Sequence, residues 1–341
     1  MSEPEAPRTL SPAGGVARPW LLADIGGTNA RFGWLDGDGT AVAHVQTLPT
    51  AEHAGPAEAA RAYLAQLSQA LGARYRAPRG GAFAVATAVG GDRVGFTNNG
   101  WNFSRSATQA QLGLSQLLLL NDFEALALSL PRLAPHQQRA IGRTPPAPRG
   151  TLAVIGPGTG LGVAGLVPTA HGWVAVPGEG GHSSVSAADD FESALLAAVR
   201  REFAHVSAER VLSGIGLPVL HRAVAEVLGQ PAGAALPAEE IVERGLNGQD
   251  AACSRAIDSF CALLGSFAGN VALVLGARGG VFIGGGIVPR LGERFFESRF
   301  RERFEAKGRF QSYLQAIPTA LITDTLAALG GAAMALEQHE G

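Results

Sequence analysis

The sequence predicts an α/β protein built from two similar lobes, and three observations point to this fold class. The chain has 341 residues, a length that suggests about two domains. Hydrophobic residues make up 46% and charged residues 16% of the chain, which predicts a sizeable buried core and excludes disorder for most of it. Each half also opens with a strand, a glycine-rich turn and a returning strand. This weak duplication of pattern, followed by helices, predicts two lobes with a cleft between them.

The first half begins with short apolar segments that glycines separate. Gly26-Gly27 interrupts the first apolar run, and Asp36-Gly37-Asp38-Gly39 has the composition of a hairpin turn. Tyr63 and Leu67 recur at the spacing of one helix face. The elements expected here are strands at 20–25, 29–35 and 41–46, a helix at 56–71, apolar runs at 82–89 and 117–120, and a helix at 123–130.

The second half repeats this opening and then becomes mainly helical. Asp189 or Asp190 is suited to cap a helix, and Pro237 is suited to a first helical turn. The segment 145–148 is rich in proline and reads as an exposed loop. The elements expected here are strands at 151–155, 163–167, 173–176 and 279–283, and helices ending at 203, 244 and 275.

Composition excludes several classes of function. The net charge of −2 offers no electrostatic footprint for nucleic acid or an anionic membrane. Lys307 is the only lysine, so a Walker-A phosphate loop is excluded, and its charged surroundings predict a solvated helix end. Cys253 and Cys261 cannot form a disulfide framework and are expected to be buried small hydrophobes in a reducing cytoplasm. Residues 1–18 read as a flexible tail, and the apolar run 260–275 as a buried helix rather than a membrane span.

Two glycine-rich turns are candidates for binding phosphate, one in each half. Glycines allow the backbone to approach an anion, and successive N–H groups can form an anion-binding concavity. Read alone, each turn is about as well explained as a plain structural turn, but their equivalent places in the two halves favour a shared polyphosphate. The residues concerned are Asp24, Gly26, Gly27, Thr28 and Asn29 in the first half, and Gly158, Thr159 and Gly160 in the second.

A carboxylate after a buried strand is the candidate general base. Asp122 follows Asn121 at the end of the run 117–120 and precedes a helix, so it is either a base or the N-cap of that helix. Glu179 and His182 lie three apart in a glycine-rich loop and could contact a polyhydroxylated ligand. A metal pair is the weaker reading of that loop, because no third ligand follows at a suitable spacing. Glu209 is either a further ligand or one partner of a surface pair with Arg210.

A last turn follows an apolar strand near the end of the second half. Gly284, Gly285 and Gly286 precede Ile287 and expose bare backbone, against which a flat ring such as adenine could lie. A plain turn after the strand explains the same residues as well.

Together these motifs resemble bacterial glucokinases, the group that lacks the cysteine-rich zinc motif of the repressor/kinase sugar-kinase family. The segments are LLADIGGTNARFGW, TNNGWNFS, VIGPGTGLGVAGLV, HVSAERVLSGIGL, GGVFIGGGIVPR, LLLLNDFEALALSLP and PGEGGH, and they span nearly all of the chain beyond Arg18. The combination of NDFEA, PGEGGH and HVSAERVLSG is the most specific part.

The resemblance implies an actin-like ATPase fold with two RNase-H-like lobes, a small one at 19–132 plus 322–341 and a large one at 133–321. It implies transfer of the γ-phosphoryl of ATP to the 6-hydroxyl of glucose, with Mg²⁺, in a cytoplasmic homodimer that binds neither nucleic acid nor membrane. Asp122 would be the general base, and Asp24 would position Mg²⁺. The sugar hydroxyls would be bound by Asn98 or Asn99, Asn121, Glu179, His182 and Glu209. The two phosphate turns would hold ATP, and residues 284–287 would flank its adenine.

Two alternatives remain beside a glucose kinase. One is an actin-like ATPase or sugar-sensing regulator that binds nucleotide without phosphorylating sugar. The other is a kinase for another hexose, because epimers differ in the direction of one hydroxyl and a sequence does not place side chains that finely.

Overall fold

The computed structural model describes residues 18–37, 41–96, 100–142, 150–230 and 234–339. The chain forms two compact units, Met1–Ala125 with Ala328–Gly341 and Leu126–Ala327. These divisions fall inside helices α3 (Asp122–Ser129) and α12 (Ala327–His339), close to the sequence-based boundaries at 132/133 and 321/322. Residues 1–17 of the expected tail lie outside the described residues. Arg18 is held in place, because its guanidinium pairs with Glu337 at 3.1 Å and lies over the ring of Trp20.

Unit 1 is built on a sheet whose strands lie in the order β3-β2-β1-β4-β7. Strands β1, β4 and β7 are parallel, whereas β2 is antiparallel to both β1 and β3. The strand bounds are β1 Trp20–Ile25, β2 Asn29–Leu35, β3 Ala43–Pro49, β4 Gly80–Val85 and β7 Gln116–Asn121. The expected first two strands are therefore confirmed at their predicted bounds, and the third lies slightly later than predicted.

Helices cover both faces of this sheet. The ring of Tyr63 in α1 (Pro56–Leu71) stacks on Phe32 of β2, with ring centroids 5.4 Å apart. A side chain at the next residue, Gly33, would instead meet Leu329 of α12. Because adjacent strand residues face opposite sides of a sheet, α1 and α12 cover opposite faces. Helix α2 (Arg105–Leu112) and the small hairpin of β5 (Arg93–Gly95) and β6 (Asn102–Ser104) complete the unit.

Unit 2 repeats this arrangement in its own sheet, with the order β11-β10-β9-β12-β13-β8. Strands β9, β12 and β13 are parallel, and β10 is antiparallel to both β9 and β11. The first five strands thus match the order and direction of the five in unit 1. The strand bounds are β8 Gln138–Ile141, β9 Leu152–Pro157, β10 Leu161–Thr169, β11 Gly172–Gly178, β12 Gly280–Ile283 and β13 Thr319–Ile322. The duplication expected from the sequence pattern is therefore present in the topology.

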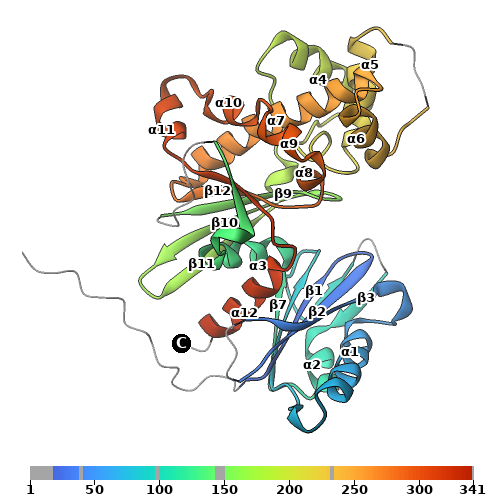
Figure 1. Ribbon diagram of the computed structural model, residues 1–341, viewed down its shortest axis with the longest axis vertical. Coiled ribbons are helices and arrows are strands. Elements are labelled where there is room, and N and C mark those ends of the chain that lie inside the picture. The colour runs from blue at the N-terminus through green and yellow to red at the C-terminus, as the bar shows by residue number, and fades with distance from the viewer. Residues whose placement is uncertain (1–17, 38–40, 97–99, 143–149, 231–233, 340–341) are drawn as a thin grey trace, which may run out of the picture. The chain divides into compact units, whose positions relative to one another are not determined.

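The helices of unit 2 gather around α7 (Ala251–Leu275), whose label lies among theirs in Figure 1. This helix is long and apolar enough to cross a membrane, but 72% of its most apolar window is buried inside the protein. It belongs to the core of unit 2, as predicted for the run 260–275. The other helices are α4 Asp190–Glu202, α5 Leu217–Val227, α6 Ala238–Leu246, α8 Ile287–Leu291, α9 Glu293–Phe296, α10 Phe300–Glu305 and α11 Gln311–Gln315.

Helix α10 packs closely on α7 at two glycines four residues apart. A side chain at Gly265 would overlap the carbonyl oxygen of Phe300, and one at Gly269 would lie 2.6 Å from that of Phe304. Lys307 follows α10 and corrects the prediction of a solvated helix end. Its Nζ donates hydrogen bonds to Ser266 O and Asn270 Oδ1 of α7, at 2.8 and 2.7 Å. Burial lowers the pKa of this lysine.

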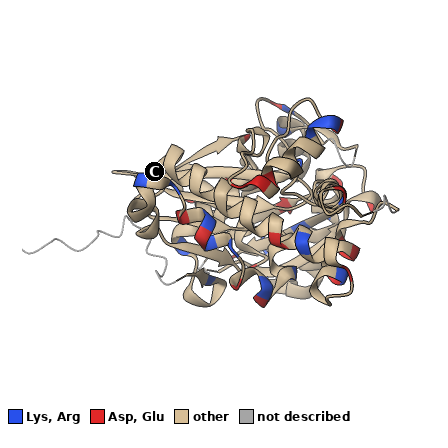
Figure 2. Cartoon of the chain, turned by 90° about the horizontal axis from the view of Figure 1, so that it is seen from above, with Lys and Arg blue, Asp and Glu red and all other residues tan. Residues whose placement is uncertain are grey.

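Charged residues are spread over the described chain with both signs interspersed (Figure 2). Most of the ion pairs lie at the surface, as between Arg139 and Glu293. The picture shows no block of a single sign among the described residues, in keeping with the net charge of −2.

Candidate active site

In unit 1, the candidate residues gather where the parallel strands end. Asp24 is in register with Ala84 of β4, which is in register with Leu120 of β7. The carboxyl ends of β1, β4 and β7 therefore lie at one edge, where open α/β sheets bind their ligands. This register brings Asp24 close to Asp122, whose pKa the charge of Asp24 raises.

Asn121, rather than Asp122, is the N-cap of α3. Asn121 Oδ1 accepts a hydrogen bond from Phe123 N at 3.0 Å, and Glu124 Oε2 accepts one from Asn121 N at 3.3 Å. This reciprocal pattern is a variant of the capping box, in which the cap accepts from the second helical N–H and the third helical residue, Glu124, accepts from the cap. Asn121 Nδ2 also donates to Thr87 O at 3.3 Å. Both the oxygen and the nitrogen of this amide, which was expected to bind sugar, therefore make hydrogen bonds within the protein. The alternative prediction that Asp122 is the N-cap is wrong, because Asp122 is the first residue of α3.

The environment of Asp122 suits a general base. Burial raises the pKa of this carboxyl to about 6, and the nearby charge of Asp24 adds to the increase. The N–H of Phe123, which donates to Asp122 Oδ1 at 3.0 Å, acts in the opposite direction. The group is thus mostly ionised at neutral pH and far more basic than an exposed aspartate, which is what proton abstraction requires.

Asp24 is held by its neighbour across the sheet. Asp24 and Arg31 are directly paired on β1 and β2, and Arg31 Nη1 lies 3.2 Å from Asp24 Oδ2. Burial raises the pKa of Asp24, and the Arg31 guanidinium partly offsets this increase. A second cation beside Asp24 would therefore stabilise its ionised form.

The turn that follows β1 is closed by hydrogen bonds to its carbonyl oxygens. Gly26 N donates to Asn29 O, Thr50 Oγ1 to Gly27 O, and Thr50 N to Thr28 O, each at 2.9 Å. The side chains of Thr28 and Asn29 are exposed beside this fixed backbone. The turn is therefore rigid and open to solvent, as a phosphate-binding loop must be. Asn98 and Asn99 lie outside the described residues.

In unit 2, Glu209 joins three candidate segments. Its Oε2 accepts a hydrogen bond from Leu161 N at 2.9 Å, and its N donates to Gly181 O at 2.9 Å. A side chain at Gly160 would lie 2.5 Å from the same carboxylate oxygen. The turn at Gly158–Gly160 is thus held by a residue far along the chain, and this turn is shorter than the predicted 156–162. The alternative pairing with Arg210 is not formed, because the Arg210 guanidinium lies over Phe203.

The loop with Glu179 and His182 lies beside this turn. A side chain at Gly181 would overlap the carbonyl oxygen of Leu161, so only glycine permits this approach. Glu179 and His182 are exposed on either side of this buried glycine. His205 Nε2 donates to His182 O at 2.9 Å and fixes the backbone of the loop. The structure therefore brings Glu179, His182 and Glu209 to the same end of β10.

The turn after β12 lies next to the turn after β9. Gly284 N donates to Ile155 O at 2.8 Å. Gly285 has a φ of +77°, and a side chain there would overlap Pro157 O. Gly285 and Gly286 are exposed, whereas Ile287 is buried in the core at the start of α8. Bare backbone therefore faces solvent here, but the side chain of Ile287 points into the protein.

Residues 21–339 match the family model for glucokinase. The chain belongs to the glucokinase family. It is 50% identical to a glucokinase of Chromobacterium violaceum over 95% of this chain and 90% of the relative, and 49% identical to one of Paramagnetospirillum magneticum over 92% and 96%. A solved glucokinase from an Antarctic psychrotroph is 38% identical, with a TM-score of 0.85, and the match covers 94% of this chain and 98% of that one.

The match agrees with the actin-like ATPase fold expected from the resemblance, in which both units carry a sheet of the same topology. Sequence analysis did not identify Glu124, which lies within a segment that resembles the family and positions the start of α3 through its hydrogen bond from Asn121 N. The sequence did contain a signal for this role. Glu124 follows Asn121 by three residues, which is the spacing of a capping box. Burial raises the pKa of Glu124 as well.

Proposed function

We propose that this chain transfers the γ-phosphoryl group of ATP to the 6-hydroxyl of glucose, giving glucose 6-phosphate and ADP. The observation that carries the proposal is the capping box at Asn121 and Glu124, which leaves the basic carboxylate of Asp122 beside Asp24. Family membership supports the substrate, because the relatives are named as glucokinases. The product is the first phosphorylated sugar of glycolysis.

In this mechanism Asp122 accepts the proton of the sugar 6-hydroxyl while the hydroxyl oxygen bonds to the γ-phosphorus and the bond to ADP breaks. Glu179, His182 and Glu209 bind sugar hydroxyls, with Asn98 or Asn99. Asn121 contributes mainly by capping α3, since its amide is already engaged. The Asp122 carboxyl group keeps this proton during the transfer and releases it to solvent after the product dissociates.

The turns after β1 and β9 bind phosphates of ATP, and the N–H groups of Gly26 and Gly158 close these turns from within by donating to Asn29 O and Gly160 O. Gly26, Gly27, Thr28 and Asn29 form the first turn, and Gly158, Thr159 and Gly160 the second. The adenine lies against the exposed backbone of Gly285 and Gly286, while the buried Gly284 and Ile287 support the turn from the core. Phosphoryl transfer needs mainly such positioning, so the absence of a lysine from these turns is no obstacle.

Mg²⁺ fits the carboxylates of unit 1. Asp24 and Asp122 are hard oxygen donors, and burial raises the pKa of Asp24, an increase that Arg31 only partly offsets. Mg²⁺ is typically bound by one or two carboxylates together with phosphate and water. Asp24 would hold the ion, which neutralises charge on the phosphates when bound. The enzyme works in the cytoplasm as a homodimer, and the exposed apolar side chains of Val174, Val176 and Val274 in unit 2 support self-association.

Sugar dependence separates this proposal from its alternatives. We expect ADP formation in a coupled assay to require a sugar, with kcat/KM highest for glucose and lower for fructose and mannose. Hydrolysis of ATP at the same rate without sugar would instead indicate the ATPase or regulator. A preference for another hexose would leave the kinase in place and refute glucose as the substrate.

The pH profile tests the environment of the base. Because Asp122 acts in its ionised form, kcat/KM for glucose should fall about tenfold per pH unit below a pKa of about 6. In the Asp24→Asn variant, which is also expected to be slower, the loss of the neighbouring charge should move this acidic limb to lower pH. An acidic limb that stays in place, or moves to higher pH, would contradict the coupling between the two carboxylates.

A further inference from the structure

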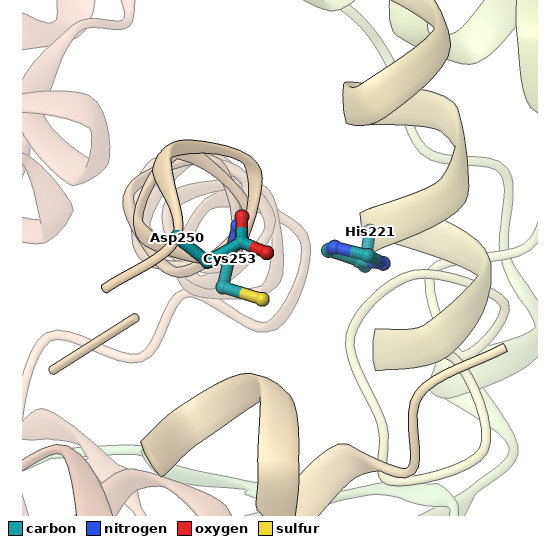
Figure 3. Close-up of side chains that lie close together, drawn as sticks. All are labelled: His221, Asp250 and Cys253. Carbon is teal, nitrogen blue, oxygen red and sulfur yellow. The ribbon is translucent and has the colours of Figure 1, made fainter. Parts of the chain in front are cut away.

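Three potential metal ligands converge in unit 2, away from the residues assigned above. His221 lies on α5, Asp250 is the N-cap of α7, and Cys253 lies in the first turn of α7. One ligand atom from each residue lies within 4.8 Å of the other two. Figure 3 shows the imidazole of His221 projecting toward the carboxylate and the thiol from a separate helix.

The imidazole of His221 has no hydrogen-bond partner among the residues that the structure describes. Both ring nitrogens are buried, and neither is bonded to a protein group. Leaving a buried polar atom unpaired costs about 1–3 kcal/mol, so such atoms usually mark a bound ion or water. Burial lowers the pKa of this histidine, which favours the neutral imidazole that binds metals.

The other two ligands are fixed in position. Asp250 Oδ1 accepts hydrogen bonds from Ala252 N at 2.8 Å and Cys253 N at 3.0 Å. Cys253 is buried, and its backbone is part of the helix that Asp250 caps. The neighbouring cations have partners of their own, because Arg222 pairs with Glu202 and Arg244 with Glu240. Both arginines lower the pKa of His221 through their charge, but each is engaged by a carboxylate of its own.

We propose that His221, Asp250 and Cys253 bind one Zn²⁺ ion that joins α5 to the start of α7, with water as the fourth ligand. Nitrogen, oxygen and sulfur donors together match zinc, whereas a thiolate disfavours Mg²⁺ and Ca²⁺. Tetrahedral bonds of the usual lengths place ligand atoms about 3.5 Å apart, so small side-chain rotations would close the site. The Cys253 S–H proton passes to solvent as the sulfur–zinc bond forms, and the two anionic ligands balance the charge of the ion.

The sequence alone did not suggest this site. Sequence analysis considered Cys253 only together with Cys261. The structure instead brings Cys253 of α7 close to His221, which lies on α5. Burial raises the pKa of the Cys253 thiol to about 11, so its proton is released only when the sulfur binds the metal ion. The site is separate from the Mg²⁺ position proposed at Asp24, which lies in unit 1.

Cobalt binding tests the proposal on the full chain after dialysis against a chelator. Co²⁺ should bind at one ion per chain and give a thiolate-to-cobalt charge-transfer band, which Zn²⁺ but not Mg²⁺ removes. Cys253→Ala should abolish the band, and His221→Gln should weaken cobalt binding at least tenfold, while Cys261→Ala, the matched change at the other buried cysteine, should keep it. Zn²⁺ should also raise the Tm of the wild-type chain relative to chelator.

The opposite results would overturn the site. No charge-transfer band in the wild type, or an equal band in Cys253→Ala, would show that Cys253 is not a ligand. Loss of the band in Cys261→Ala alone would place the thiolate at the other cysteine. The wild-type titration and the Tm shift need no variant, so a variant that fails to fold still leaves the proposal open to refutation.

Discussion

Replacing Asp122 by asparagine is expected to lower kcat for glucose phosphorylation by at least ~10²-fold, the low end of general-base effects. Asparagine keeps the size of the side chain and can still accept the hydrogen bond from Phe123 N. It cannot accept a proton from the sugar hydroxyl. Steady-state kinetics with saturating ATP and glucose measure the change, and KM for both substrates should move little.

The same substitution should stabilise the folded protein. An acid whose folded pKa is raised contributes most to stability at low pH, and the contribution is lost as pH rises from the unfolded value through the folded value. For Asp122 this window runs from its ordinary pKa of 3.8 to about 6. Above it, the ionised carboxylate costs on the order of 1–3 kcal/mol, which asparagine removes. The variant should therefore melt at a higher temperature than wild type at pH 7.5, although it is far less active.

This pairing of effects separates catalysis from damage. Asp36→Asn makes the same chemical change at an exposed carboxylate of unit 1 beyond the end of β2, and should leave kcat and Tm unchanged. Near-normal turnover of Asp122→Asn would remove Asp122 from the role of base. A low kcat together with a lowered Tm would show instead that the substitution disrupts the end of α3.

The sequence was most informative where the signal was local. The strands at 20–25 and 29–35 and the helix at 56–71 have their predicted bounds, because glycine turns and apolar periodicity mark their ends. Asp189 caps α4 as one of two predicted candidates, its side chain accepting from Glu192 N at 2.9 Å. Local chemistry also predicted the position of Asp122, since a carboxylate directly after an apolar strand falls at the edge of the sheet.

Missed elements had weak or contradictory local signals. Helix α12 contains Gly330 and Gly331, which lower helix propensity, and its helical state depends on packing of residues such as Leu329 against β2. Strand β13 has only the short run Thr319–Ile322 and is defined by its neighbours β12 and β8. Helix α5 was missed despite a visible signal, a proline in its first turn followed by apolar residues at helical spacing.

The site depends on contacts that no local pattern encodes. Glu209 holds Leu161 from 48 positions away, so the sequence could indicate a carboxylate but not its role in fixing the phosphate turn. The choice between a sugar ligand and a surface pair was open for the same reason. Only the folded chain shows that Arg210 turns to Phe203 and leaves the Glu209 carboxylate beside Gly160.

The second large effect is expected at a buried ion pair in unit 2. Arg303 Nη2 of α10 lies 2.6 Å from Glu192 Oε2 of α4, and the side chains are only 5% and 3% exposed. Arg303 Nε donates to Ser266 Oγ of α7 at 3.1 Å, and Ala188 N donates to Glu192 Oε2 at 2.8 Å. The pair thus links α4, α7 and α10 at a point that water does not reach.

Glu192→Ala should lower the free energy of unfolding by at most about 3–5 kcal/mol. The buried Arg303 guanidinium then keeps only the partly exposed Asp189, whose Oδ2 lies 3.5 Å from Arg303 Nη1. Chemical denaturation followed by circular dichroism measures this change. Glu202→Ala is the matched control, since Glu202 pairs with Arg222 at 2.8 Å but both side chains are about half exposed. That exposed pair should contribute about 0–1 kcal/mol.

The double variant Glu192→Leu with Arg303→Met distinguishes the attraction between the charges from the cost of burying them. Replacing both partners by apolar side chains of similar volume removes the unpaired charge, so most of the stability lost in Glu192→Ala should return. The two changes should therefore be strongly non-additive. If the double variant is as unstable as the sum of Glu192→Leu and Arg303→Met, the loss in Glu192→Ala comes from packing between α4 and α10 and not from an uncompensated charge.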